Sequence, residues 1–254
     1  MIKVAMMQLK TIFDDLDSNL QKIQSSLEEI REKNIDIALF PETCDLGWAN
    51  PNSIHYAQPI PGTVSNFFCE MAKKYHLHIV TGITEKEGAH LYNSALLISP
   101  NGKIILKHRK INLVQGVEDM IYSFGQKLEV CNTPLGKIGV NICADNLKSS
   151  HILGHTLAEM GADIILSPSA WAVPPKFDQT KTPYGDIWIN SYHDISSKHH
   201  IPVIGVSNVG ILTAGIWKGW KAIGNSIAYN SHGEPIAILP FGDEAEHIHI
   251  LNVS

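Results

Sequence analysis

The sequence has 254 residues, of which 44% are hydrophobic and 18% charged, and its formal net charge is −5. This composition argues against intrinsic disorder, and no run reaches the roughly 20 consecutive apolar residues that a membrane-spanning helix needs. The acidic balance, without a long basic run, argues against a nucleic-acid or anionic-membrane partner. The four cysteines have no C-x-x-C spacing and no export signal accompanies them, so we expect a cytoplasmic protein without a disulfide framework or zinc ribbon.

The first 40 residues predict a strand, a helix and a second strand. Residues 3–8 form a short apolar run, and residues 36–40 form another that Pro41 ends. Between them, apolar residues recur every three or four positions and so share one helical face: Leu16, Leu20, Ile23, Leu27 and Ile30. A strand–helix–strand unit of this length favours parallel pairing with a right-handed crossover.

The same order continues along the chain and then repeats. A helix at residues 65–76, a strand at 78–83 and a hairpin turning at Asn101-Gly102 complete the first half. The second half predicts strands and helices in a similar order, at residues 138–142, 150–160, 164–167, 184–199 and 203–207.

Short related segments support this repeat. Residues 36–41 resemble residues 163–168, 127 positions later, and Asn93-Ser94 recurs as Asn225-Ser226, 132 positions later. No Pro/Gly/Ser-rich linker separates the halves, so we expect residues 1–254 to form a single domain. Two sheets packed face to face, with helices over both outer faces, would bury every apolar stripe. The sequence therefore predicts an α+β fold, a four-layer αββα sandwich with an internal pseudo-twofold repeat.

Three segments place polar or reactive residues at the ends of predicted strands, where functional residues concentrate. Glu42 follows a buried strand directly, Lys110 belongs to a cationic cluster that ends the hairpin, and Cys143 ends an apolar strand. Each residue also has an ordinary structural explanation. Cysteine is often inert core packing, a lone glutamate can cap a helix or turn, and a basic cluster at a hairpin end is usually solvated.

Together, in this order and at this spacing, the three segments resemble the nitrilase superfamily of carbon–nitrogen hydrolases. The resemblance covers essentially the whole chain and rests on Phe-Pro-Glu at 40–42, Arg-Lys-Ile-Asn-Leu at 109–113 and Gly-Val-Asn-Ile-Cys-Ala-Asp at 139–145. It implies a Glu–Lys–Cys catalytic triad on an αββα fold, usually assembled as dimers or larger oligomers. That chemistry requires no cofactor, and we expect no metal site.

The resemblance implies a role for each residue. Cys143 is the nucleophile, which stores the acyl group as a thioester. Glu42 accepts the thiol proton, donates it to the leaving ammonia or amine, and later activates water. Lys110 holds the tetrahedral oxyanion together with the backbone N–H of Ala144. Glu118 matches the additional glutamate of the family and is expected to orient Lys110 or to dock the substrate amine.

Some features limit how far the resemblance identifies a substrate. Family members often carry an aromatic residue directly after the cysteine, whereas Ala144 follows it here. The connection from Trp171 to Trp188 is long and is expected to line the pocket mouth, so these two residues are either substrate-binding walls or plain core. Trp217 and Trp220 flank a glycine-rich loop that suits an oligomer interface or a substrate lid equally well.

The sequence therefore predicts a cysteine-dependent hydrolase that cleaves a small linear amide or N-carbamoyl compound and releases ammonia. We expect the protein to form a homodimer or higher homo-oligomer. A nitrilase acting on a small nitrile and a non-catalytic binding or scaffold protein are alternatives. A metal-dependent hydrolase is a further alternative, because His151, His155 and Glu159 share one helical face. The H-E-x-x-H order of zinc proteases is absent.

Overall fold

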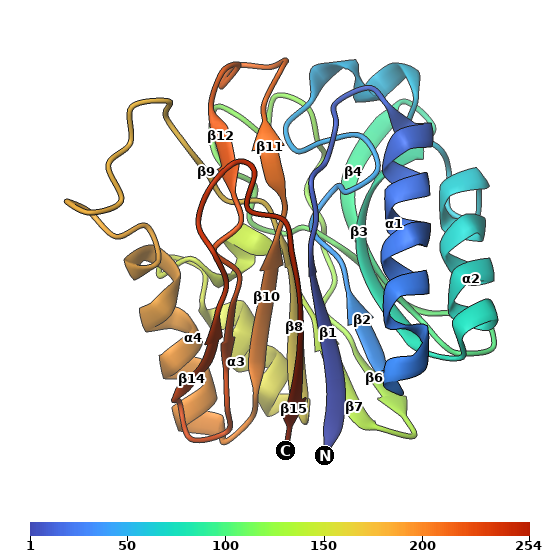
Figure 1. The fold of residues 1–254 in the computed structure, drawn as a ribbon, viewed down its shortest axis with the longest axis vertical. Helices are drawn as coiled ribbons and strands as arrows, with labels where there is room; N and C mark the ends of the chain where they lie inside the picture. Colours follow the sequence, from blue (N-terminus) through green and yellow to red (C-terminus); the bar gives the residue numbers. More distant parts are fainter.

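In the computed structural model, which describes residues 1–254, two six-stranded sheets pack against each other (Figure 1). The first has the order β15-β1-β2-β3-β4-β5 and the second the order β14-β13-β10-β8-β7-β6. The strands of the first sheet are β1 (Ile2–Gln8), β2 (Ile37–Leu39), β3 (His78–Glu87), β4 (His90–Ile98), β5 (Ile104–Arg109) and β15 (His247–Val253). Those of the second are β6 (Val130–Thr133), β7 (Gly136–Val140), β8 (Ile164–Ser169), β10 (Val203–Ser207), β13 (Ile227–Tyr229) and β14 (Pro235–Ile238).

The two sheets repeat one topology. In each, three parallel strands precede two antiparallel ones: β1-β2-β3 then β4-β5, and β7-β8-β10 then β13-β14. The sixth strand lies antiparallel to the first, β15 beside β1 and β6 beside β7. Each half of the chain thus lends its last strand to the other half's sheet. The expected αββα sandwich with a pseudo-twofold repeat is confirmed.

Four helices cover the outer faces of the sandwich. Figure 1 shows α1 (Leu16–Ile30) and α2 (Thr63–Tyr75) against the first sheet, and α3 (Ile152–Glu159) and α4 (Asp186–His199) against the second. Successive residues of β1 therefore meet different layers. Val4 and Met6 belong to the core between the sheets, whereas Ala5 and Met7 pack with the side chains of α1 and α2. Because both faces of the sheet are buried, its strands are continuous apolar runs rather than alternating ones.

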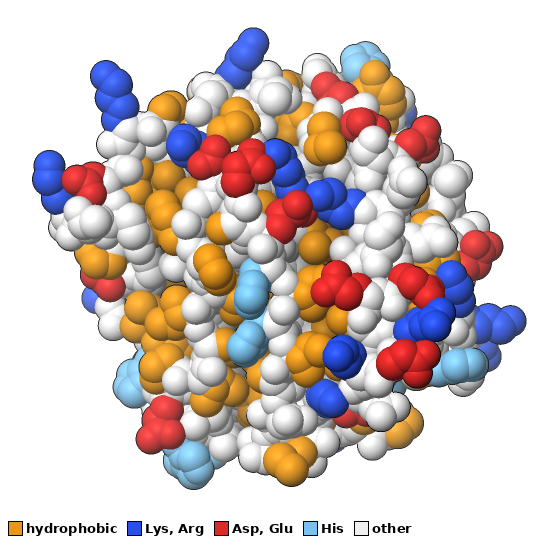
Figure 2. Space-filling view, in the orientation of Figure 1, with side chains coloured by type: hydrophobic (Ala, Val, Ile, Leu, Met, Phe, Trp, Pro, Cys, Tyr) orange, Lys and Arg blue, Asp and Glu red, His pale blue; other side chains and the backbone are white.

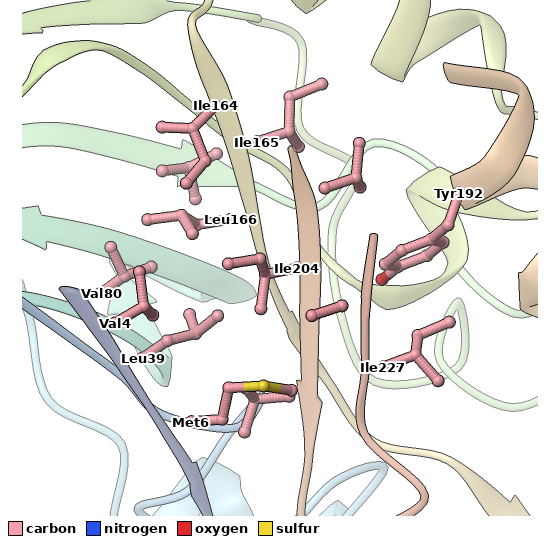
Figure 3. Close-up of a cluster of buried hydrophobic side chains, with 14 of the residues drawn as sticks. Val4, Met6, Leu39, Val80, Ile164, Ile165, Leu166, Tyr192, Ile204 and Ile227 are labelled. Carbon is pink, nitrogen blue, oxygen red and sulfur yellow. The ribbon is translucent and has the colours of Figure 1, made fainter. Parts of the chain in front are cut away.

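The core between the sheets is formed by side chains from both halves of the chain. Figure 3 shows them meeting between the two layers, with Val4, Met6, Leu39 and Val80 on one side and Ile164, Leu166 and Ile204 on the other. Parallel strands of both sheets end at the same edge of the sandwich. A small third sheet lies there, formed by β9 (Ala172–Val173), β11 (Val209–Ile211) and β12 (Lys221–Ile223) (Figure 1). The two chain termini lie together at the opposite edge.

The outer surface carries charges of both signs. Figure 2 shows acidic and basic side chains interspersed over one face, with hydrophobic side chains gathered on the side of α4 and β14. No helix combines the length and apolar character that crossing a bilayer requires.

Candidate active site

Glu42 lies just beyond the end of β2, where the two sheets come together. Its backbone N–H donates to the carbonyl of Ser169 in the second sheet, at 3.1 Å. The neighbouring strand β3 provides space for this turn, since a Cβ on Gly82 would lie 2.5 Å from the Cα of Glu42. A glycine is therefore required beside Glu42 for steric reasons, and the turn fixes where the carboxylate points.

Lys110 is buried at the end of β5 between two carboxylates. Its Nζ lies 2.6 Å from Oε1 of Glu42, and 2.8 and 2.7 Å from Oε1 and Oε2 of Glu118. All three side chains are almost fully excluded from solvent. A hairpin end would ordinarily expose such a lysine, but here the paired carboxylates supply the hydrogen bonds that a buried ammonium needs. The solvated alternative for Lys110 is therefore wrong.

Both carboxylate oxygens of Glu118 accept hydrogen bonds from more than one donor. Besides Lys110, its donors are Trp48 Nε1 at 2.9 Å, Asn93 Nδ2 at 3.0 Å and the backbone N–H of Val114 at 2.8 Å. An ionised carboxylate only accepts hydrogen bonds, so this set of donors fits the charged form. The adjacent Asp119 is exposed and bonds only within its own turn, to Gly116 N–H at 2.7 Å, which distinguishes the two acids.

The electrostatics of this cluster favour a protonated acid and a protonated thiol. Burial, together with the charge of Glu118, raises the pKa of Glu42 to about 7 against the opposing influence of Lys110. Burial and the charge of Glu42 likewise raise the pKa of Cys143 well above that of a free thiol. Although burial disfavours a charged amine, the two carboxylates raise the pKa of Lys110 well above its ordinary value. The lysine stays cationic while Glu42 exchanges protons near neutral pH.

Cys143 sits at a sharp turn beyond β7. Its φ of 41° lies in the left-handed region, which is uncommon for residues other than glycine, and it starts a short 3₁₀ turn at Cys143–Asn146. Only 3% of the residue is exposed, and its Sγ–H donates a hydrogen bond to the carbonyl of Ala170, at 3.7 Å. Strained backbone at a residue of this kind is typical of functional sites.

Asp145 ties the cysteine turn to the end of β5. Its carboxylate accepts hydrogen bonds from the backbone N–H of Ile142 at 3.0 Å and of Asn112 at 2.8 Å. It also lies 2.8 Å from Nε2 of His108, and Asn112 in turn donates to the carbonyl of Ala144 at 2.6 Å. Since Lys110 stands between His108 and Asn112 in the chain, this network holds the lysine and the cysteine in one frame.

A cavity of about 310 Å³ opens at Cys143 and Ala144. Trp188 lines it, together with Phe177 and Tyr184 from the long connection that the sequence assigns to the pocket mouth. Trp171 does not line the cavity but stacks behind Trp188, with ring centroids 5.1 Å apart. Trp217 and Trp220, stacked at 4.0 Å, form part of the wall with Trp48.

The sequence analysis assigned no role to Asn93, Trp48 or Asp145. Asn93 Nδ2 donates to both Glu42 and Glu118, which makes it a third member of the lysine cluster. The sequence feature that could have indicated Asn93 is its place as a polar residue just before the apolar run of β4. The contacts of Trp48 and Asp145 join segments distant in sequence, and no local pattern indicates them.

The histidines singled out in the sequence form a separate cluster on the outer helices. His151, His155 and Asp194 have potential ligand atoms within 4.8 Å of one another. The ring of His155 lies 2.8 Å from His199 and 3.2 Å from Asp194, whereas Glu159 lies beside His199 instead, at 3.7 Å. None of these residues lines the cavity at the cysteine, so they are not part of the candidate active site.

Comparisons with known proteins identify the family of the chain. A family model for carbon-nitrogen hydrolase matches residues 3–253. The probable nitrilase C965.09 of Schizosaccharomyces pombe is 29% identical over 214 residues, which cover 82% of this chain and 74% of that protein. The omega-amidase NIT2 of Danio rerio is 29% identical over 162 residues, which cover 60% of this chain and 58% of that protein.

The fold has close structural counterparts as well. The crystal structure of a carbon-nitrogen hydrolase from Helicobacter pylori G27 matches with a TM-score of 0.88 at 19% identity, covering 100% of this chain and 89% of that one. This likeness concerns the fold, whereas the family model extends over nearly every residue of the chain. The chain belongs to the carbon-nitrogen hydrolase family.

Proposed function

We propose that this protein is a cysteine-dependent amidohydrolase that cleaves the carbon–nitrogen bond of a small amide or N-carbamoyl compound and releases ammonia. The observation that carries the proposal is the buried cluster beside the cavity. One ammonium, Lys110, is shared by Glu42 and Glu118, next to a buried thiol on a strained turn. A thiol, a proton acceptor and a fixed cation are the groups that acyl transfer requires.

Acylation begins when the Cys143 thiol gives its proton to Glu42 and its sulfur forms a bond to the carbonyl carbon. The carbonyl oxygen becomes an oxyanion in the tetrahedral intermediate. Glu42 then passes the proton to the nitrogen, the carbon–nitrogen bond breaks, and ammonia leaves a thioester, or a thiocarbamate for a carbamoyl substrate. One oxygen of Glu42, Oε2, has no hydrogen-bond partner in the cluster and is free for this exchange.

Deacylation uses the same acid in reverse. Water gives a proton to Glu42 as its oxygen adds to the thioester carbon. The second tetrahedral intermediate collapses to the carboxylic acid and expels the sulfur, which recovers the proton from Glu42. A pKa of about 7 suits both directions, because the acid and the base form of Glu42 are then both populated at neutral pH.

The oxyanion needs donors, and the geometry limits which groups can serve. The three N–H bonds of Lys110 already face three carboxylate oxygens. Lys110 therefore has to release one of its two contacts with Glu118 to reach the oxyanion. We propose that the backbone N–H of Ala144, at the start of the turn, is the second donor. One such donor lowers the barrier by about 3–4 kcal/mol.

The test is ammonia release from a panel of small amides, N-carbamoyl compounds and nitriles, with Cys143→Ala beside the wild type. We expect the variant to fold and to lose turnover by at least about 10³-fold. Cys44→Ala is the matched control, because Cys44 is also buried but contacts Thr81 and Gly82 rather than the cluster. Retained turnover in Cys143→Ala would remove Cys143 as the nucleophile, and nitriles as the only substrates would indicate a nitrilase instead.

A further inference from the structure

The cavity at Cys143 has an unusual lining for an enzyme of small polar amides. Fourteen of its 15 lining residues are hydrophobic, and no Asp, Glu, Lys, Arg, His, Asn or Gln is among them. The only side-chain hydroxyl is that of Tyr184. A volume of about 310 Å³ stands at the lower end of ligand pockets, roughly 300–1,000 Å³, and so suits a small molecule.

Two separate groups of aromatic rings form the walls. The first group contains Trp48, Trp217 and Trp220. The ring centroid of Trp217 lies 5.3 Å from that of Trp48 and 4.0 Å from that of Trp220. The second group contains Phe177 and Tyr184, whose ring centroids lie 6.2 Å apart, together with Trp188. No ring of one group contacts a ring of the other, yet both line the same cavity. The cavity therefore lies between two aromatic surfaces, which favours a flat apolar ligand.

The same lining disfavours a negatively charged substrate. A buried carboxylate needs a cation or several hydrogen-bond donors, and the lining offers no cationic side chain. The nearest cation described in the site is Lys110, whose three N–H bonds already face the two glutamates. When Glu42 is ionised, as acceptance of the thiol proton requires, two carboxylates around one ammonium leave an excess of negative charge behind the cysteine, which repels an anionic substrate.

We propose that the substrate is an uncharged amide whose acyl group is flat and apolar, an aryl or arylalkyl carboxamide, held between the two aromatic walls. This rests on the proposed function and narrows it. Amides that carry a free carboxylate, including N-carbamoyl amino acids, are then poor substrates. Trp217 is a specificity-determining residue, because it contacts both other tryptophans of its wall and is only half-buried, on a loop.

The experiment compares two amides of similar shape and different charge, 4-methylbenzamide and 4-carbamoylbenzoate. With the wild-type chain we expect kcat/KM for ammonia release to be at least about 100-fold higher for the neutral amide. Trp217→Ala should lower kcat/KM for 4-methylbenzamide more than for acetamide, which is too small to touch both walls, and Trp217→Phe should restore part of the loss. Phe124→Ala, an exposed aromatic outside this cavity, is the control and should change neither.

The failure of this inference can be separated from the failure of the proposed function. Equal or faster Cys143-dependent turnover of 4-carbamoylbenzoate, or a preference for a trimethylammonio-substituted amide held by cation–π contacts, would overturn the inference alone. If neither amide is turned over, binding to Cys143→Ala is measured by quenching of tryptophan fluorescence. Tighter binding of 4-methylbenzamide still supports the neutral pocket, and tighter binding of the carboxylate rejects it.

Discussion

Replacing Glu118 by Gln tests whether this residue sets the proton affinity of Glu42. Both carboxylates bond the same ammonium, at 2.6 Å from Glu42 and at 2.7 and 2.8 Å from Glu118. Their negative charges are therefore close together. Burial raises the pKa of Glu42 to about 7, against the influence of Lys110, and the charge of Glu118 adds to this increase. In Glu118→Gln this charge is gone while Lys110 remains, so Glu42 should ionise at lower pH.

The magnitude follows from Coulomb's law. Two unit charges about 5 Å apart at an effective dielectric constant of about 20 interact by about 3 kcal/mol, which corresponds to about 2 pKa units. Screening and relaxation reduce this, so we expect a shift of about 1–2 units. The substitution also replaces one acceptor oxygen by an NH₂ donor. If the NH₂ takes the place of Oε1 it faces the N–H groups of Trp48 and Asn93, and if it takes the place of Oε2 it faces the backbone N–H of Val114. A donor left unpaired in this way should cost about 1–3 kcal/mol of stability.

The assay is the pH dependence of kcat/KM, supported by the rate at which iodoacetamide alkylates Cys143. Because Glu42 must be ionised to accept the thiol proton, kcat/KM should rise with pH through a midpoint near 7 in the wild type. In Glu118→Gln the midpoint should move to lower pH. Asp119→Asn removes the same charge one residue away, where the side chain is exposed, and should leave the midpoint in place. A midpoint that stays near 7 in Glu118→Gln, or rises, would refute the argument.

Three further changes have definite expected outcomes. The pKa of Glu42 is raised from 4.5 to about 7 on folding, so its contribution to stability is present below pH 4.5 and is lost as the pH rises to about 7. This loss amounts to about 3 kcal/mol of unfolding free energy, and it should be absent in Glu42→Gln when the free energy is measured by urea unfolding across this pH range. An unchanged pH dependence in the variant would contradict the assignment. Asp145→Asn should lower kcat and thermal stability together, because the hydrogen-bond network that joins the turn at Cys143 to the segment around Lys110 loses its carboxylate acceptor. A drop in stability with kcat intact would make Asp145 merely structural. Gly82→Ala should unfold readily or lose activity, since the added Cβ meets the backbone at Glu42, and wild-type activity and melting temperature would show that the turn can move.

Much of the fold is predictable from the sequence because both faces of each sheet are buried. The apolar runs of residues 3–8 and 36–40 became β1 and β2, and the helical stripe from Leu16 to Ile30 became α1 at those bounds. The strand β6 was not predicted. It is a short hairpin partner of β7 whose residues are mostly half-buried, so no apolar run or alternation indicates it.

The candidate site is predictable only in part for a similar reason. Glu42 and Cys143 each follow or end an apolar strand, and Lys110 belongs to a cationic cluster at a hairpin end, so all three are visible in the sequence alone. The burial of Lys110 and His108 was not foreseen, because a basic hairpin end is usually solvated and their acidic partners lie elsewhere in the chain. Asn93 was noted only as the start of a repeated dipeptide, and its contacts with both glutamates depend on tertiary packing.

The repeat also explains why the fold holds one such cluster and not two. Ser169, the last residue of β8, lies 127 positions after Glu42, which follows β2. The two residues are joined by the hydrogen bond from Glu42 N–H to the Ser169 carbonyl. A second glutamate at position 169 would bury another carboxylate in the chain segment that bonds the backbone of Glu42, whereas the cluster holds a single ammonium, Lys110. An unpaired buried charge costs several kcal/mol, so we infer that the duplicated backbone holds the charged cluster in one half only. Its two acids and its lysine come from the first half of the chain, and the buried Cys143 comes from the second.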